Sequence, residues 1–269
     1  MAKTQHAGQA PKAKKSLGQH FLNSVAVCRR IVGLLSLRPE DRLIEIGPGP
    51  GALTKILENM PHGLLLLLEK DNYWAAERMR RGAPGTQVVH TDALNFDWRR
   101  ISYRHHWKIV GNLPYNIASR LVWDIARQAE GMSKAVFMMQ YEVAKRMTAP
   151  PGNRLYGALS VWMQSFTRPR LEFTVERGAF SPQPKVLSAV VSLDPLPPGN
   201  RPPQPDILAE LLQICFQRRR KQLGSIFRQC PIPGFTEALA RLDIDATRRP
   251  ETLTPDDFQK LGENRRDFS

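Results

Sequence analysis

A short glycine-rich segment restricts the fold of this chain more than any other feature of its sequence. Apolar residues at positions 43, 44 and 46 run into Gly47, Gly49 and Gly51, and an amphipathic stretch follows. Glycines at such a junction let the chain turn tightly and bring its backbone close to a ligand. The pattern predicts a strand, a ligand-binding loop and a helix, which together open a nucleotide-binding α/β sheet.

Apolar runs of strand length alternate with amphipathic stretches over the first part of the chain. The expected strands cover residues 42–47, 64–70, 87–91, 108–111 and 134–140, and the expected helices cover 52–60, 73–80 and 117–128. Strands separated by helices predict βαβ units and a mainly parallel sheet. Runs at 172–179 and 187–194, joined by a proline-rich turn, predict an antiparallel hairpin at one edge. We therefore expect an α/β fold with a Rossmann-like sheet.

The proline-rich stretch at residues 197–205 divides the chain, because it cannot continue as a helix or a central strand. Beyond it the pattern is helical, at residues 206–229, 234–242 and 255–261. We expect a basic flexible tail over 1–16, a ligand-binding sheet domain over 17–196, a linker over 197–205 and a small all-helical domain over 206–269.

The charge balance indicates a polyanionic partner. There are 39 Lys and Arg residues against 25 Asp and Glu, a formal net charge of +14, and such a surface attracts nucleic acid. No apolar run approaches the roughly 18 residues that a membrane span needs, so we expect no membrane partner. The four consecutive basic residues at 218–221 cannot all face a core, so we expect them to be exposed. The predicted RNA-binding residues are Lys14, Lys15, Arg218, Arg219, Arg220 and Lys221.

The three cysteines, Cys28, Cys215 and Cys230, lie far apart in the sequence and form no cluster with histidines. This spacing predicts neither a metal site nor a disulfide framework. It is consistent with a reducing compartment, and we expect a cytoplasmic protein.

The acidic residues around the glycine loop favour a methyl donor over a dinucleotide. Glu45 precedes the first glycine, where a carboxylate would repel a pyrophosphate but suits a sulfonium cation. Glu69 closes the second strand, about 20 residues past the loop, a spacing that suits a carboxylate accepting ribose hydroxyls. Asp92, after the third strand, is placed to accept the exocyclic amine of the donor's adenine. The predicted cofactor is S-adenosylmethionine, with S-adenosylhomocysteine as its product.

The fourth strand ends in a motif that suits methylation of an adenine amino group. Its residues are Asn112, Leu113, Pro114 and Tyr115. The amino nitrogen is a poor nucleophile, and the Asn112 side-chain oxygen and the Leu113 carbonyl can hold its two N–H groups so that its lone pair faces the methyl group. Pro114 fixes the turn, and Tyr115 offers a face on which an extruded base stacks. Positioning of this kind needs no strong general base.

At this point the sequence resembles a known family, the ribosomal RNA adenine dimethyltransferases of the KsgA type, over nearly its whole length. The matching segments are KSLGQHFL at 15–22, EIGPGPG at 45–51, Glu69, Asp92, NLPY at 112–115, QYEVAKRM, YGALSVWMQ, FSPQPKVLSAVV and RPETLTPDDF. One departure is Tyr141, where relatives commonly carry lysine, which puts a local RNA contact in doubt.

The resemblance implies further site residues and a substrate. It implies that His20 and Leu22 contact the donor, that Asn112 borders the donor as well, and that Phe180 forms a second stacking wall for the target adenine. It also implies four methyl transfers to two adjacent adenosines near the 3′ end of small-subunit rRNA, within an assembling ribosomal subunit. We expect the protein to act as a monomer.

Three alternatives remain open from the sequence. An erythromycin-resistance methyltransferase would use the same chemistry on an adenine of large-subunit rRNA. A ribosome-assembly or transcription factor would bind RNA without turnover, although the intact NLPY motif and glycine loop speak against lost chemistry. A Rossmann oxidoreductase would bind nicotinamide and would leave the NLPY motif unexplained.

Overall fold

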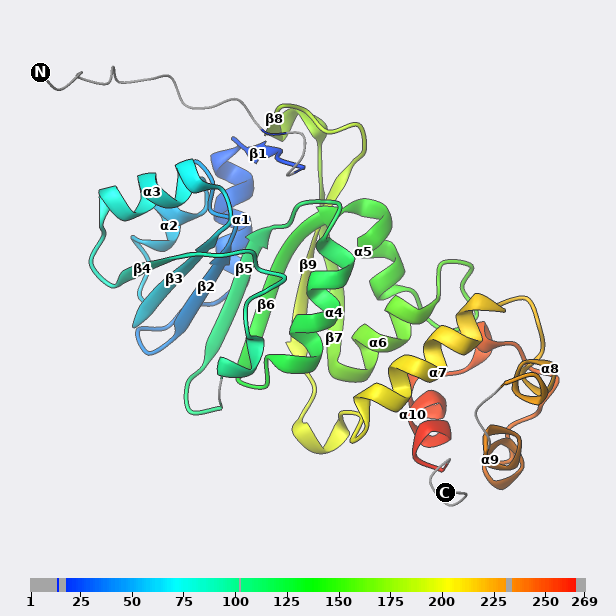
Figure 1. Cartoon of the computed structure of the whole chain (residues 1–269). Coiled ribbons are helices and arrows are strands. Elements are labelled where there is room, and N and C mark those ends of the chain that lie inside the picture. The colour runs from blue at the N-terminus through cyan, green and yellow to red at the C-terminus, as the bar shows by residue number, and fades with distance from the viewer. Residues whose placement is uncertain (1–13, 15–17, 102, 231–233, 265–269) are drawn as a thin grey trace, which may run out of the picture.

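The computed structural model describes residues 14, 18–101, 103–230 and 234–264. Within these residues the main sheet has the strand order β4-β3-β2-β5-β6-β9-β7 (Figure 1). The strands are β2 (Arg42–Ile46), β3 (Leu64–Glu69), β4 (Thr86–His90), β5 (Trp107–Asn112), β6 (Met132–Gln140), β7 (Thr167–Val175) and β9 (Ser188–Pro195). The first five are parallel, and β9 and β7 are antiparallel to their neighbours. The predicted Rossmann-like sheet with an antiparallel edge is confirmed.

Helices cover both faces of the sheet, which explains why central strands such as β2 and β5 are buried without alternation. Alternate residues of one strand enter different cores: Leu43 packs with helix α1, whereas Ile44 packs with α4. The helices of this part are α1 (Val25–Leu34), α2 (Thr54–Leu57), α3 (Asn72–Arg81), α4 (Ala118–Gln128), α5 (Tyr141–Thr148) and α6 (Ala158–Phe166). Short 3₁₀ helices lie at Trp98–Arg100, Arg177–Ala179, Pro198–Asn200 and Pro250–Thr252.

The strand order creates a crevice at one end of the sheet. From β2 the chain proceeds outward through β3 to β4 and then returns to β5 on the other side of β2. The loops that follow β2 and β5 therefore diverge in opposite directions. Open α/β sheets bind their ligands in such a crevice, at the carboxyl ends of the strands.

The expected helix at residues 52–60 is shorter than predicted, since only Thr54–Leu57 is helical. Residues on either side form turns whose N–H groups donate to carbonyls three residues back, from Gly51 to Pro48 and from Met60 to Leu57. The glycine loop thus extends further before the helix begins.

The predicted hairpin is present but longer, and a third strand interrupts it. Strand β7 begins at Thr167, directly after α6, and pairs with β9 along its length. Between them, β8 (Phe180–Ser181) leaves the main sheet and pairs with β1 (Phe21–Leu22) from the start of the chain. This second small sheet fastens the N-terminal segment beside the crevice.

The C-terminal part is helical, as predicted, but the single helix expected over 206–229 is wrong. The chain instead forms α7 (Pro205–Gln217) and α8 (Leu223–Arg228), followed by α9 (Phe235–Arg241) and α10 (Pro255–Glu263). The N–H groups of Leu223 and Gly224 donate to the carbonyls of Arg248 and Ala246, at 2.8 and 2.9 Å. These tertiary hydrogen bonds explain why α7 does not continue and why α8 begins at Leu223.

Helix α10 begins as the sequence predicts. The Thr254 side chain accepts the N–H of Asp257, and the Asp257 carboxylate accepts the N–H of Thr254 in return. Pro255 occupies the first turn, where its missing N–H costs nothing. This capping box fixes where the last helix starts.

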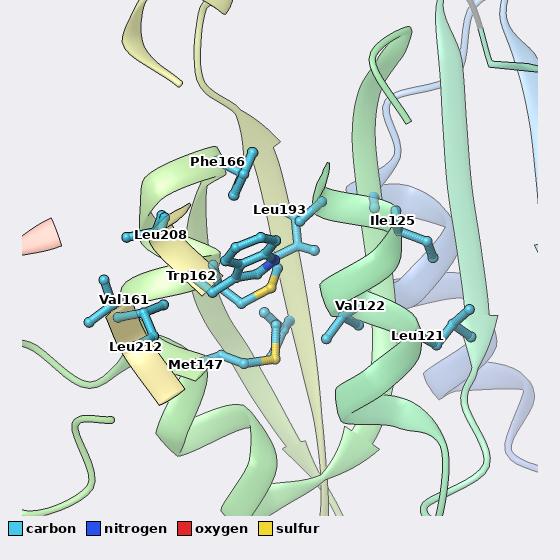
Figure 2. Packing of buried hydrophobic residues seen from close by; sticks show 14 of the residues in the cluster. Leu121, Val122, Ile125, Met147, Val161, Trp162, Phe166, Leu193, Leu208 and Leu212 are labelled. Atoms are coloured by element: carbon cyan, nitrogen blue, oxygen red, sulfur yellow. The ribbon is translucent and has the colours of Figure 1, made fainter. Parts of the chain in front are cut away.

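The main hydrophobic core continues from the sheet into the C-terminal helices. Trp162 of α6 lies fully buried at its centre, between α4, α7 and strand β9 (Figure 2). Leu208 and Leu212 of α7 pack against the same cluster as Val122 of α4. The predicted boundary near residue 197 coincides with the end of β9, yet the packing crosses it, and the division into domains stays a prediction.

Candidate active site

A pocket occupies the crevice at the carboxyl ends of the strands. Five segments line it, at residues 18–21, 46–49 without Pro48, 68–70, 91–93 and 112–117. Four of these segments follow β2, β3, β4 and β5, and the fifth is the N-terminal leader. The fold therefore brings together Gly47, Gly49, Glu69, Asp92 and the NLPY residues, as predicted from their positions at the strand ends.

The glycine loop adopts a backbone that requires glycine. Gly47 has φ +65° and Gly49 has φ +49°, in the left-handed region that other residues rarely adopt. A Cβ atom on Gly49 would lie 3.1 Å from the Phe21 ring of the leader. The loop is therefore compact and packs closely under the N-terminal segment.

Glu69 is fixed at the base of the pocket by backbone donors. Its Oε2 accepts the N–H of Gly49 at 2.9 Å, and its Oε1 accepts the N–H of Asp71 at 2.8 Å. Burial raises the pKa of this carboxyl, although both hydrogen bonds oppose the shift. Glu69 thus holds the glycine loop and faces the pocket with the same carboxylate.

Asp92 reaches the pocket from the loop after β4. Its Oδ2 accepts the Lys70 ammonium at 2.7 Å, and its Oδ1 accepts the N–H of Leu94 at 3.0 Å. Burial acts to raise the pKa of Asp92, but the Lys70 contact and the Leu94 hydrogen bond lower it overall. The carboxylate is therefore ionised and able to accept an amine.

The NLPY segment lines the pocket at the end of β5. The Asn112 Nδ2 donates to the His20 carbonyl at 2.7 Å, which leaves Oδ1 without a partner among the described residues. The Leu113 N–H donates to the Met138 carbonyl at 2.9 Å. The Tyr115 hydroxyl bonds Ser188 Oγ at 2.6 Å, which fixes the ring, and burial raises its pKa.

The leader covers one side of the pocket. The His20 ring stacks on Tyr115, with centroids 5.4 Å apart, and its Nδ1 lies 2.8 Å from the Pro182 carbonyl. In this arrangement the His20 ring occupies one face of Tyr115, the ring on which the target base is predicted to stack. Gln19 was not among the predicted site residues. It also lines the pocket, and its side-chain amide donates to the Asp71 carboxylate.

Three residues predicted to bind the donor or the target adenine, Gly51, Leu22 and Phe180, do not line this pocket. Leu22 and Phe180 pair with each other across the β1–β8 sheet and are 6% and 2% exposed. Both belong to the core on the α1 side of the sheet. The structure therefore does not place the Phe180 ring on the pocket wall.

Glu45 also lies outside the pocket, beneath the glycine loop. Its Oε2 accepts the Thr54 hydroxyl at 2.7 Å, and burial raises its pKa to about 8. It lines a smaller cavity that shares Gly47 and Asn112 with the pocket. The argument from Glu45 against a pyrophosphate stays a prediction.

Other residues of the pocket carried weaker sequence signals. Lys70 and Asn116 both line it, and each directly follows a residue that the sequence reading had singled out, Glu69 and Tyr115. Their positions next to predicted site residues are the feature from which they could have been predicted.

The predicted RNA-binding residues are found in different surroundings. The Lys14 ammonium lies 2.8 Å from Asp71, beside the pocket, and Lys15 lies outside the described residues. The run Arg218–Lys221 forms the turn between α7 and α8 rather than a helix face. Within it Arg219 pairs with Glu251 at 3.6 Å, while Arg220 and Lys221 are exposed.

Within the described residues, no group of three His, Cys, Asp or Glu side chains is arranged to hold a metal ion. No helix in that part of the chain is both long enough and apolar enough to span a membrane.

The chain is similar to known rRNA methyltransferases over most of its length. Residues 10–264 match the family model of the ribosomal RNA adenine dimethylases. A ribosomal RNA small subunit methyltransferase A of Nitratidesulfovibrio vulgaris (strain DP4) is 49% identical, over 94% of this chain and 96% of that protein. The protein of the same name from Oleidesulfovibrio alaskensis is 48% identical, over 96% of this chain and 93% of the relative.

Solved structures show the same architecture. A dimethyladenosine transferase from Plasmodium falciparum matches with a TM-score of 0.78 at 26% identity, covering 90% of this chain and 96% of that one. The 23S rRNA methyltransferase ErmE matches with a TM-score of 0.65 at 24% identity, covering 91% and 98%, and this likeness is one of fold. The resemblance predicted from the motifs is confirmed. The chain belongs to the ribosomal RNA adenine dimethylase family of methyltransferases.

Proposed function

We propose that this methyltransferase uses S-adenosylmethionine to methylate the exocyclic amino groups of two adjacent adenosines near the 3′ end of small-subunit rRNA, during ribosome assembly. The observation that carries the proposal is Asn112 at the end of β5. Its amide nitrogen is engaged by the His20 carbonyl, so its oxygen is presented as the acceptor that an adenine amino group needs.

The pocket residues fit the proposed donor. Glu69 supplies a buried carboxylate for ribose hydroxyls, and Asp92 supplies an ionised one for the adenine amine. Gly47 and Gly49 allow a close backbone approach. When bound, the donor supplies an electrophilic methyl group, and S-adenosylhomocysteine is released.

The residues around the acceptor act by orientation rather than by strong base chemistry. Asn112 Oδ1 and the Leu113 carbonyl accept the two N–H groups of the target, while Pro114 holds the turn between them. Ser188 fixes the ring of Tyr115 through its hydroxyl. This ring stacks on the target base once the His20 side chain has moved off one of its faces. Orientation of this kind supplies several kcal/mol of barrier reduction.

The choice of the small subunit rests on the relatives. Those with 48–49% identity are named small subunit methyltransferases, whereas the likeness to the 23S rRNA enzyme is one of fold. The exposed Arg220 and Lys221 support contact with rRNA phosphates through charge.

The test is to supply labelled donor together with small or large ribosomal subunits from a strain that lacks adenine dimethylation. We expect label only in small-subunit rRNA, recovered as N6,N6-dimethyladenosine after nuclease digestion. Label in large-subunit rRNA, or binding of donor and subunit without transfer, would contradict the proposal.

A further inference from the structure

Arg78 of helix α3 reaches the glycine loop from behind, away from the pocket. Its Nη2 donates to the Pro50 carbonyl at 2.7 Å, across 28 residues of sequence. A Cβ atom on Gly51 would lie only 2.4 Å from Arg78 Nη1 and 2.8 Å from Cζ. The guanidinium therefore fills the space where any side chain at position 51 would stand.

The surroundings of Arg78 are unusual for a residue that only stabilises the fold. The side chain is 5% exposed, yet no carboxylate of the described residues lies within ion-pair distance of it. Its Nε has no hydrogen-bond partner in that part of the chain. Burying a charge without a direct ion pair costs stability, and the hydrogen bond to the Pro50 carbonyl offsets only part of that cost.

Charged groups from several elements face this guanidinium at longer range. Glu45 of β2, Glu58 after α2 and Glu77 of α3 favour its charge, while Arg81 of α3 opposes it. Burial is the largest influence on this guanidinium and, together with Arg81, it lowers the pKa of Arg78 overall.

The loop has two other supports, and both differ from Arg78. Glu69 holds the Gly49 N–H and also lines the pocket. Thr54 anchors the far end of the loop to Glu45. Arg78 does not line the pocket, so any effect that it has on a ligand passes through the Pro50–Gly51 turn.

We propose that Arg78 is a positioning residue for the methyl donor, which holds the Pro50–Gly51 turn in the shape that lets Gly47 and Gly49 face the pocket. The inference rests on the proposed function, because it assigns the donor to this loop. A displaced turn weakens donor binding and leaves the adenine-holding residues at the end of β5 untouched.

The test compares Arg78→Met and Arg78→Lys with Arg81→Met, a control on the same helix whose side chain is 52% exposed. We expect Arg78→Met to raise the KM for S-adenosylmethionine about tenfold, the effect of losing one hydrogen bond from a charged donor. The kcat at saturating donor should stay near that of the wild type. Arg78→Lys should recover part of the loss, and Arg81→Met should behave as the wild type.

A stability measurement separates positioning from a structural role. Methionine removes a buried charge, so the urea midpoint of Arg78→Met should equal or exceed that of the wild type. A lowered midpoint together with a lowered kcat would overturn the inference, as would an unchanged KM. If the methionine variant does not fold, Arg78→Lys decides: a KM equal to that of the wild type would overturn the inference.

Calorimetric titration with S-adenosylhomocysteine distinguishes this inference from the proposed function. Binding to the wild type with weaker binding to Arg78→Met supports the positioning role. Equal binding to both overturns only that role. Absence of binding and of methyl transfer in the wild type would instead refute the proposed function, and the inference with it.

Discussion

Two glutamates on neighbouring strands, Glu45 and Glu69, are both buried but have different partners. Glu69 accepts two backbone N–H groups, whereas Glu45 accepts one hydroxyl, from Thr54. Burial is the largest cause of the raised pKa at both residues, and at Glu45 it raises the pKa from 4.5 to about 8. At neutral pH Glu45 is mostly a neutral acid under the loop, whereas Glu69 lines the pocket.

The pH dependence of stability tests this assignment for Glu45. The unfolded chain ionises near pH 4.5 and the folded chain near 8, so the folded state holds the extra proton between these values. Its contribution is fully present below about 4.5 and is lost as the pH rises through about 8. Glu45→Gln keeps an acceptor for Thr54 and should gain up to about 5 kcal/mol over the wild type across this window.

Urea unfolding of both proteins at several pH values in this window measures the difference. The free energy of unfolding of Glu45→Gln should exceed that of the wild type increasingly as the pH rises. A difference that stays constant with pH would show that Glu45 does not titrate as described.

The sequence predicted Glu69, Asp92 and Asn112 because each follows a strand of a parallel sheet. The direction of Glu45 could not be predicted, since both faces of that sheet are covered and its strands show no polar alternation. The burial of Phe180 depends on pairing with Leu22, which is distant in sequence. The turn at Arg218–Lys221 depends on tertiary bonds from Leu223 and Gly224, which no local pattern encodes.

At the scale of elements, a buried ion pair joins the start of β2 to β5. Lys108 Nζ lies 2.6 Å from Asp41 Oδ2, and the two side chains are 10% and 3% exposed. The ammonium also donates to the Ser36 carbonyl at 2.7 Å. This contact joins β5, which ends in the NLPY motif, to the segment between α1 and β2.

Removing one partner of this pair should be costly. Lys108→Met leaves the Asp41 carboxylate buried without its cation, and we expect a loss of about 3–5 kcal/mol in the free energy of unfolding. The matched control is Lys134→Met, whose partner Asp194 is 3.5 Å away and more exposed, with an expected loss below about 1 kcal/mol. Urea unfolding measures both, and equal losses would contradict the account.

At the scale of the whole molecule, two features bear on RNA binding. They are the net charge of +14 and the continuous core. The core runs from the sheet into the C-terminal helices, so the turn at Arg218–Lys221 is carried on packed structure. Phosphate contacts from such a turn release counterions, and binding should weaken steeply with salt.

The salt dependence of subunit binding tests the role of this turn. Arg220→Gln combined with Lys221→Gln should lower the slope of log affinity against log salt by about 1.5 to 2. Arg99→Gln with Arg100→Gln serves as the control, because both arginines are exposed but pair with Asp97. A slope unchanged in the first pair, or lowered equally in both, would exclude the turn as a phosphate contact.

The most direct measurement is the rate of methyl transfer by Asn112→Ala at saturating donor, on small subunits that lack adenine dimethylation. Because we propose that Asn112 presents the acceptor oxygen, we expect the wild type to form N6,N6-dimethyladenosine and the variant to be at least about 100-fold slower. Calorimetry should show that the variant still binds S-adenosylhomocysteine. Transfer by Asn112→Ala at the wild-type rate, or a methylated nucleoside other than adenosine, would contradict the central claim.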